Sequence, residues 1–131
     1  MKMFLGYVKI SVLLFFIFFN SSCGKDPGGG GIFLPDLSAQ WTNKASATNT
    51  FFFLVNDATK NTSTFTGNDF VSGTLQGQFS GSYTNHDISF KYTSGSKNGK
   101  GYSGTINDAS NVITLTSADV GLVSPLTLEK R

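Results

Sequence analysis

Residues 88–92 read Ile88-Ser89-Phe90-Lys91-Tyr92, with a large apolar side chain at every second position and polar side chains between them. The same alternation recurs at Val112–Thr116 and at Leu126–Lys130. A period of two is typical of a β-strand that buries one of its faces. After the N-terminal region, no stretch keeps helical spacing over three turns. The sequence therefore predicts an all-β domain.

Turn residues divide the chain from residue 36 to residue 131 into short segments. Runs rich in Gly, Asn, Asp and Ser, such as Gly67-Asn68, tolerate turn geometry and separate the segments. We expect about eight strands, and the number depends on whether residues 70–83 form one bent strand or two. The segments are Ser38–Asn43, Thr48–Asn56, Thr62–Thr66, Phe70–Leu75, Gln78–Thr84, Ile88–Thr93, Lys100–Ile106, Val112–Thr116 and Leu126–Lys130.

Large side chains and glycines share one face between residues 70 and 83. They are Val71, Leu75, Phe79 and Tyr83 with Gly73, Gly77 and Gly81. Glycine weakens a flat strand, so this mixture favours sharp coiling, as at the corners of a small barrel. Closing the sheet also removes exposed strand edges. Many short strands fit a barrel or a sandwich, and we predict a small antiparallel up-and-down β-barrel. A ligand cavity inside it would be lined by Val71, Leu75, Phe90, Ile113 and Leu128.

The beginning and the end of this domain carry a resemblance. Ala39-Gln40-Trp41 lies in the first expected strand, and the basic residue Arg131 ends the last one. This arrangement resembles the lipocalin-like (calycin) group, which includes avidin-type barrels, although Ala39 stands where that group has glycine. The resemblance implies that Trp41 plugs one barrel end beneath the late basic residue.

Cys23 is the only cysteine and follows an apolar run, Ile10–Phe19. Lys2 and Lys9 precede that run, and the small polar residues 20–22 follow it. This layout predicts a secretory signal peptide. The run is about half of the roughly 20 residues that a membrane-spanning helix needs, which favours cleavage. An exported chain with one unpaired cysteine is unusual, because exported cysteines normally pair.

The same stretch resembles the signal peptide and lipobox of bacterial lipoproteins, in which the cysteine is acylated, for instance with palmitate. Asn20 departs from the aliphatic residue usual at its position, and the alternative is an ordinary signal peptide followed by a spare thiol. We predict a signal peptide over residues 1–22, a lipidated Cys23 with a glycine-rich tether over residues 23–35, and a barrel domain over residues 36–131. Gly28–Gly31 make the tether flexible.

The predicted anchor implies a place in the cell envelope. Two or more acyl chains hold a protein stably at a membrane, and we expect an outer-membrane lipoprotein, either surface-exposed or facing the periplasm. The pair Lys25-Asp26 slightly favours exposure on the cell surface. Removing residues 1–22 leaves eight basic and eight acidic residues, a formal net charge of zero. A neutral domain does not indicate nucleic-acid binding.

Residues for catalysis are few. The single histidine, His86, stands beside Asp87 in an expected turn, where adjacent side chains point apart and do not form a base with its orienting group. With Cys23 acylated, neither a second histidine nor a free thiol remains for zinc. No phosphate or dinucleotide motif is present. We expect a protein that is not an enzyme and needs no cofactor or metal.

Aromatic residues are the candidates for ligand contact. Trp41 either plugs the barrel or stacks on a ligand at its mouth, and the rings expected to join it are Tyr83, Phe90, Tyr92 and Tyr102. Alternation sends Phe52 to the face opposite Phe51 and Phe53. Either the segment 32–34 covers Phe52, or Phe52 marks a contact with a partner.

Three functions remain open. The first, which we favour, is a lipid-anchored, non-catalytic lipocalin-like protein that binds a small apolar or aromatic ligand or serves the cell envelope. The second is a protein-binding module, such as a small-barrel protease inhibitor or an accessory subunit. The third is a carbohydrate-binding surface protein, which requires at least two of Trp41, Tyr83, Tyr92 and Tyr102 to be exposed on one face.

Overall fold

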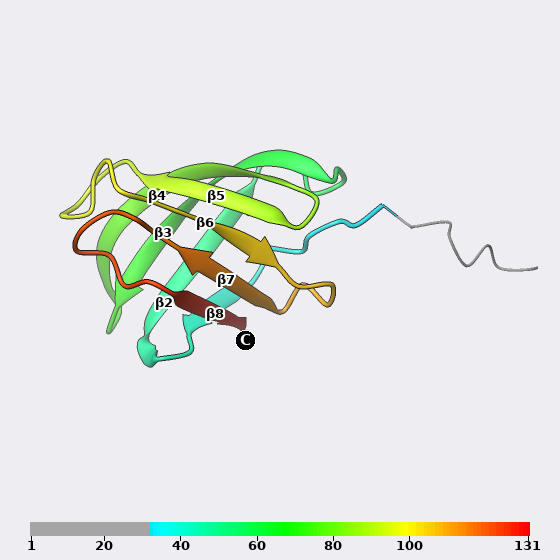
Figure 1. The fold of residues 1–131 in the computed structure, drawn as a ribbon. Coiled ribbons are helices and arrows are strands. Elements are labelled where there is room, and N and C mark those ends of the chain that lie inside the picture. The colour runs from blue at the N-terminus through cyan, green and yellow to red at the C-terminus, as the bar shows by residue number, and fades with distance from the viewer. Residues whose placement is uncertain (1–31) are drawn as a thin grey trace, which may run out of the picture. The chain divides into compact units, whose positions relative to one another are not determined.

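The computed structural model describes residues 32–131, and every regular element in that range is a β-strand (Figure 1). Each strand pairs in antiparallel fashion with its chain neighbours, and β8 pairs with β1 to close the barrel. The predicted all-β, up-and-down barrel is confirmed, and it is consistent with a lipocalin-like fold. The predicted signal peptide and Cys23 lie outside the described residues. The strands are β1 (Gln40–Asn43), β2 (Ser46–Val55), β3 (Thr62–Val71), β4 (Thr74–Thr84), β5 (Asp87–Tyr92), β6 (Gly101–Ile106), β7 (Val112–Thr116) and β8 (Leu126–Lys130).

Aromatic side chains fill the barrel interior. Alternate residues of each strand point inward, and the neighbouring rings of Phe53, Phe65, Phe79 and Phe90 have centroids 4.4–6.4 Å apart. Most of these pairs meet edge to face, the arrangement that aromatic quadrupoles prefer. The buried aromatic residues are Trp41, Phe51, Phe53, Phe65, Phe79, Tyr83, Phe90, Tyr92 and Tyr102.

The β3–β4 hairpin differs from the expected strands. The predicted turn at Gly67-Asn68 is wrong, because β3 continues through both residues to Val71. Within β3, Gly67 leaves room for the Phe79 ring, because a Cβ atom there would lie 2.2 Å from that ring. The turn is Ser72-Gly73, whose φ angles of 50° and 78° suit a two-residue hairpin connection. The predicted strand Phe70–Leu75 is therefore the end of β3, this turn and the start of β4.

A bulge also changes which residues face inward near this turn. Asp69 pairs with Gly77 and Phe70 pairs with Leu75, so Gln76 is an extra residue on β4. One extra residue reverses the alternation, because side chains have a period of two. Leu75 is consequently exposed on β4, whereas Val71 is exposed because it ends β3 beside the turn, and the predicted place of both in the interior is wrong. The other predicted interior residues, Phe90, Ile113 and Leu128, are buried.

The alternating strands give the barrel two distinct ends. The chain enters β1 close to Trp41, and the β2–β3, β4–β5 and β6–β7 turns lie at the same end, which we call the Trp41 end. The β1–β2, β3–β4, β5–β6 and β7–β8 connections lie at the opposite end. We call it the Lys97 end, after a lysine in the β5–β6 loop.

Candidate binding surfaces

All five rings predicted to bind a ligand lie in the barrel interior. Trp41, Tyr83, Phe90, Tyr92 and Tyr102 are each at most 5% exposed. Phe90 packs against two of the others, because its ring lies 6.0 Å from that of Tyr92 and 5.5 Å from that of Tyr102. The condition that two of these rings share an exposed face, which a sugar site built from them needs, is not met. These side chains fill the barrel.

The Trp41 end is closed by a lysine over an aromatic ring. The Trp41 indole N–H donates to the Leu37 carbonyl at 3.2 Å. The ammonium nitrogen of Lys130 lies 5.8 Å from the centroid of the Trp41 ring, within cation–π range. It also pairs with Asp36 at 2.5 Å. The basic residue over Trp41 is thus Lys130, and not Arg131 as the resemblance implied.

The Asp36 carboxylate at this end has a lowered pKa. The hydrogen bond from Lys130 is the largest cause, followed by that from the Ser38 hydroxyl, and together they hold the pKa of Asp36 at about 2. Asp36 is 59% exposed, so water screens this ion pair strongly. The closure of the Trp41 end therefore depends more on the buried ring than on the charge pair.

The Lys97 end contains a buried polar network centred on Asp69, whose side chain is 0% exposed. Asn49 donates to its Oδ1 atom at 2.6 Å, and the Tyr92 hydroxyl donates to Oδ2 at 2.8 Å. The Lys97 ammonium pairs with the same Oδ2 atom at 2.6 Å and lies 5.1 Å from the centroid of the Tyr92 ring. A buried carboxylate must be both paired and hydrogen-bonded, and these three donors meet that need.

Two tyrosines near Asp69 resist ionisation. Burial is the main cause that raises the pKa of Tyr102 to about 12, and the nearby Asp69 charge adds to it. The same two causes, in the same order, raise the pKa of Tyr92 far above its usual value. Both phenols therefore stay protonated at neutral pH. The Tyr102 hydroxyl donates to the Val123 carbonyl at 2.9 Å and so ties the β7–β8 loop to this end.

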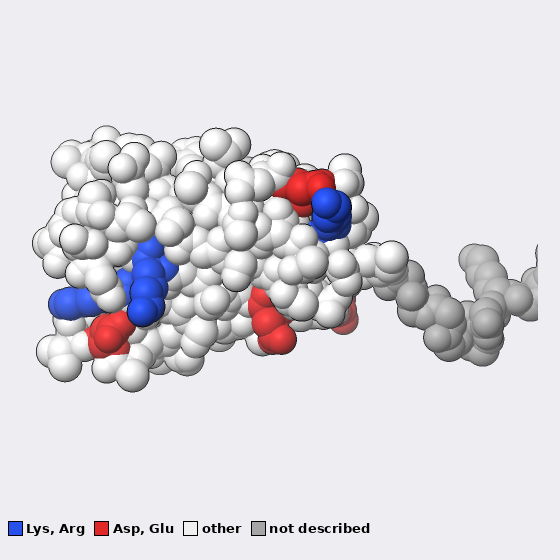
Figure 2. All heavy atoms as spheres, turned by 90° about the horizontal axis from the view of Figure 1, so that it is seen from above, with Lys and Arg blue, Asp and Glu red and all other residues white. Residues whose placement is uncertain are grey.

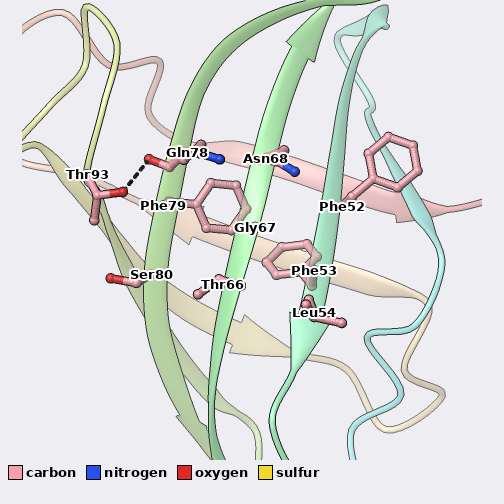
Figure 3. Close-up of a pocket in the computed structure, with 10 residues that line it drawn as sticks. All are labelled: Phe52, Phe53, Leu54, Thr66, Gly67, Asn68, Gln78, Phe79, Ser80 and Thr93. Carbon is pink, nitrogen blue, oxygen red and sulfur yellow. Dashed lines mark hydrogen bonds between the residues drawn. The ribbon is translucent and has the colours of Figure 1, made fainter.

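The outer wall of β2, β3 and β4 carries an exposed apolar strip, formed by Leu54, Phe52, Phe70 and Leu75. Phe52 is 41%, Leu54 71% and Leu75 49% exposed. The rings of Phe52 and Phe70 meet at right angles with centroids 5.7 Å apart. In Figure 3, the side chains of Phe52 and Phe53 point to opposite sides of β2. The Phe53 ring lies near the Phe79 ring and the Gly67 backbone. The strip runs from the end of β2, next to the β2–β3 connection, to the β3–β4 turn.

Polar but uncharged residues surround the apolar strip. Two shallow depressions border Phe52, one toward β3 and β4 and the other toward the β1–β2 and β3–β4 turns. Every residue that lines either depression is uncharged. Figure 2 shows a face of the barrel on which the charged side chains gather toward the two ends and leave a broad uncharged area. The strip can therefore contribute apolar area to a contact with another molecule, but no ion pair.

The segment before β1 packs against the β4–β5 turn. The Phe33 ring stacks on the His86 ring, with centroids 3.8 Å apart and planes 9° from parallel. His86 lies in the β4–β5 turn, as expected, and its Nε2 atom is 2.7 Å from Asp108 Oδ1. Asp87, its neighbour in sequence, is not its partner. Phe33 thus packs beside His86, while Phe52 remains exposed.

Within residues 32–131, no three His, Cys, Asp or Glu side chains gather in a group that could hold a metal ion. The described part of the chain also lacks a helix with the length and hydropathy to span a bilayer. Comparison with protein-family models, with curated proteins and with solved structures finds no match for this chain.

Sequence reasoning missed the Asp69 network and the strip beyond Phe52. Asp69 follows Asn68 in an apparent turn, where aspartate is explained by local hydrogen bonds. Its parity with Phe65 and Gly67 on one strand would have placed it inside the barrel. Phe70 continues the regular alternation of β3 and so lies outward beside Phe52, a contact that is lost when Phe70 is taken as the start of a separate strand.

Proposed function

We propose that this protein is a membrane-anchored bacterial lipoprotein whose barrel is a non-catalytic binding module, and that it meets its partner on the outer wall. Cys23, acylated after removal of residues 1–22, would supply the anchor. The observation that carries the proposal is a contrast between the inside and the outside. The interior is filled by aromatic rings, whereas Phe52, Leu54 and Leu75 stand exposed on one wall.

Burial energetics support the outer wall as the contact surface. Apolar area contributes roughly 25 cal/mol per Å² when it leaves water, and exposed aromatic residues in an uncharged surround are typical of the centres of protein interfaces. Binding inside the barrel would instead require displacing several of the packed rings. It would also require opening an end that Lys130 or Lys97 closes. A small apolar ligand in the interior is for these reasons the less favoured function.

Single cysteine variants test this proposal in native membranes. Thr66→Cys places a thiol on the exposed face of β3, in the depression beside Leu54, and Thr105→Cys places a matched thiol on the exposed face of β6. We expect a membrane-impermeant maleimide to label Thr66→Cys several-fold more slowly than Thr105→Cys in cell-envelope membranes. The two rates should become equal after the protein is extracted into detergent and diluted. Equal rates in the membranes would contradict an outer-wall contact.

The parent chain serves as the control for the anchor. Its only thiol is Cys23, so an acylated Cys23 leaves nothing for the maleimide to modify, even after denaturation. Cys23→Ala should move the protein into the soluble fraction. A reactive Cys23 thiol, or Cys23→Ala protein that stays in the membrane pellet, would contradict lipid anchoring.

A further inference from the structure

We infer that the partner on the outer wall is a second copy of this chain, packed so that the two apolar strips face each other. This inference rests on the proposed outer-wall contact and names its occupant. Two properties of the wall favour self-association, namely its lack of charge and its direction along the barrel, and its size sets the strength of the pair.

Charge gives the first argument. When two copies of one surface meet about a two-fold axis, each side chain meets its own kind or a nearby residue. A charged wall would then place like charges together, which opposes association. The residues lining the depressions beside Phe52 are all uncharged, so this wall can meet itself without repulsion. The side-chain amides of Asn68 and Gln78 make no hydrogen bond within residues 32–131 and are free to bond across the contact.

The direction of the strip gives the second argument. The strip begins at Leu54, near the Trp41 end, and reaches Leu75, near the Lys97 end. When two barrels pack strip to strip about a two-fold axis that runs parallel to the strips, their Trp41 ends lie on the same side of the pair. The chain enters the barrel at that end, and the nine residues Gly24–Ile32 can reach at most about 30 Å from Cys23. Both anchors can therefore enter one membrane.

The area of the wall limits the strength of the pair. Strands β2, β3 and β4 have 10, 10 and 11 residues, so their wall measures about 34 Å by 14 Å, or about 480 Å². A stable interface buries about 800 Å² on each partner, and about 500 Å² is the lower limit for a specific one. The pair is accordingly weak in dilute solution. Anchoring in one membrane raises the effective concentration of the two walls and stabilises the pair there.

Cross-linking of the acylated full-length chain in its own membranes tests the inference. A flexible thiol-to-thiol reagent should convert Thr66→Cys into a product that contains two copies of this chain and nothing else, as identified by mass spectrometry. Thr105→Cys should give no such product. Adding Phe52→Ser and Phe70→Ser to Thr66→Cys should abolish the product, while Val112→Ser, at a half-buried position on the outward face of β7, should leave it unchanged.

Folding of the serine variants is checked by their cooperative unfolding transition, which should stay two-state because both phenylalanines point outward. The outcomes separate the two claims. If Thr66→Cys is protected from maleimide in membranes but gives no product made of this chain alone, the outer-wall contact stands and the second copy is overturned. If Thr66→Cys is labelled as fast as Thr105→Cys, the outer-wall contact itself fails.

Discussion

The two ends of the barrel are closed by the same three groups, a lysine, an aromatic ring and an aspartate, but at different depths. At the Trp41 end, Lys130 lies over Trp41 and pairs with Asp36, which is largely in water. At the Lys97 end, Lys97 lies over Tyr92 and pairs with Asp69, which is fully buried. The same contacts therefore have different energies at the two ends, because the cost of losing an ion pair depends on how far the remaining charge is from water.

The depth also changes what each aspartate needs. Asp36 receives bonds from Lys130 and Ser38 and is hydrated as well. Asp69 depends entirely on Asn49, Tyr92 and Lys97. Losing one donor should therefore cost more free energy at the Lys97 end, since each of its donors compensates a charge that water does not reach.

The largest expected difference follows from removing each lysine ammonium while keeping its stem. Lys97→Met should lower the free energy of unfolding by about 3 kcal/mol, because it leaves the buried Asp69 carboxylate unpaired. Lys130→Met should cost about 1 kcal/mol or less, because Asp36 is solvated. Urea unfolding of the two variants and the parent measures both values. Equal losses in the two variants would refute the dependence on depth.

A smaller difference is expected for the tyrosine hydroxyls at the two ends. Tyr92→Phe removes a bond to a buried carboxylate and should cost about 2 kcal/mol. Tyr83, at the Trp41 end, donates to the carbonyls of Asp57 and Lys60 at 3.3 and 3.1 Å. Losing bonds to neutral carbonyls in Tyr83→Phe should cost about 1 kcal/mol. The same urea measurement applies, and a costlier Tyr83→Phe would reverse the expected order.

The smallest effect concerns pH at the Trp41 end. The pKa of Asp36 is about 2 in the folded protein, below its ordinary value of 3.8, because Lys130 and Ser38 bond to the carboxylate. A lowered folded-state pKa means that the stabilisation is complete above about pH 4 and is lost as the pH falls toward 2. Asp36→Asn should therefore be less stable than the parent at pH 6, by less than about 1 kcal/mol for such an exposed pair. Unfolding at a series of pH values should show this gap closing near pH 2, and a gap that widens on acidification would contradict the assignment.

The sequence was sufficient for the architecture. Strict alternation of apolar and polar residues depends only on which face of a strand is buried. The three alternating segments all lie in β-strands, and they are Ile88–Tyr92, Val112–Thr116 and Leu126–Lys130. The place of Trp41 at a barrel end was implied by the resemblance to the lipocalin-like group, and the structure buries its ring there.

The contacts between strands could not be predicted in the same way. The outward place of Leu75 depends on a single bulge residue, Gln76, whereas Asp69 and Phe70 keep the regular alternation of a strand that continues past the expected turn. Alternation along one strand carries no information about the register of its neighbour. For the same reason the Lys97 contact was not foreseen, because a loop 28 residues along the chain supplies the partner of Asp69.

The barrel is closed at both ends and filled by its own aromatic rings, and we propose that it is anchored through Cys23 and makes its contacts from outside. A native mass spectrum of the protein, gently extracted from its own membranes, tests that claim most directly. The account predicts a chain that begins at Cys23, carries acyl chains and retains no further small molecule. A stoichiometric apolar molecule retained by the barrel, or an unmodified Cys23 thiol, would contradict it.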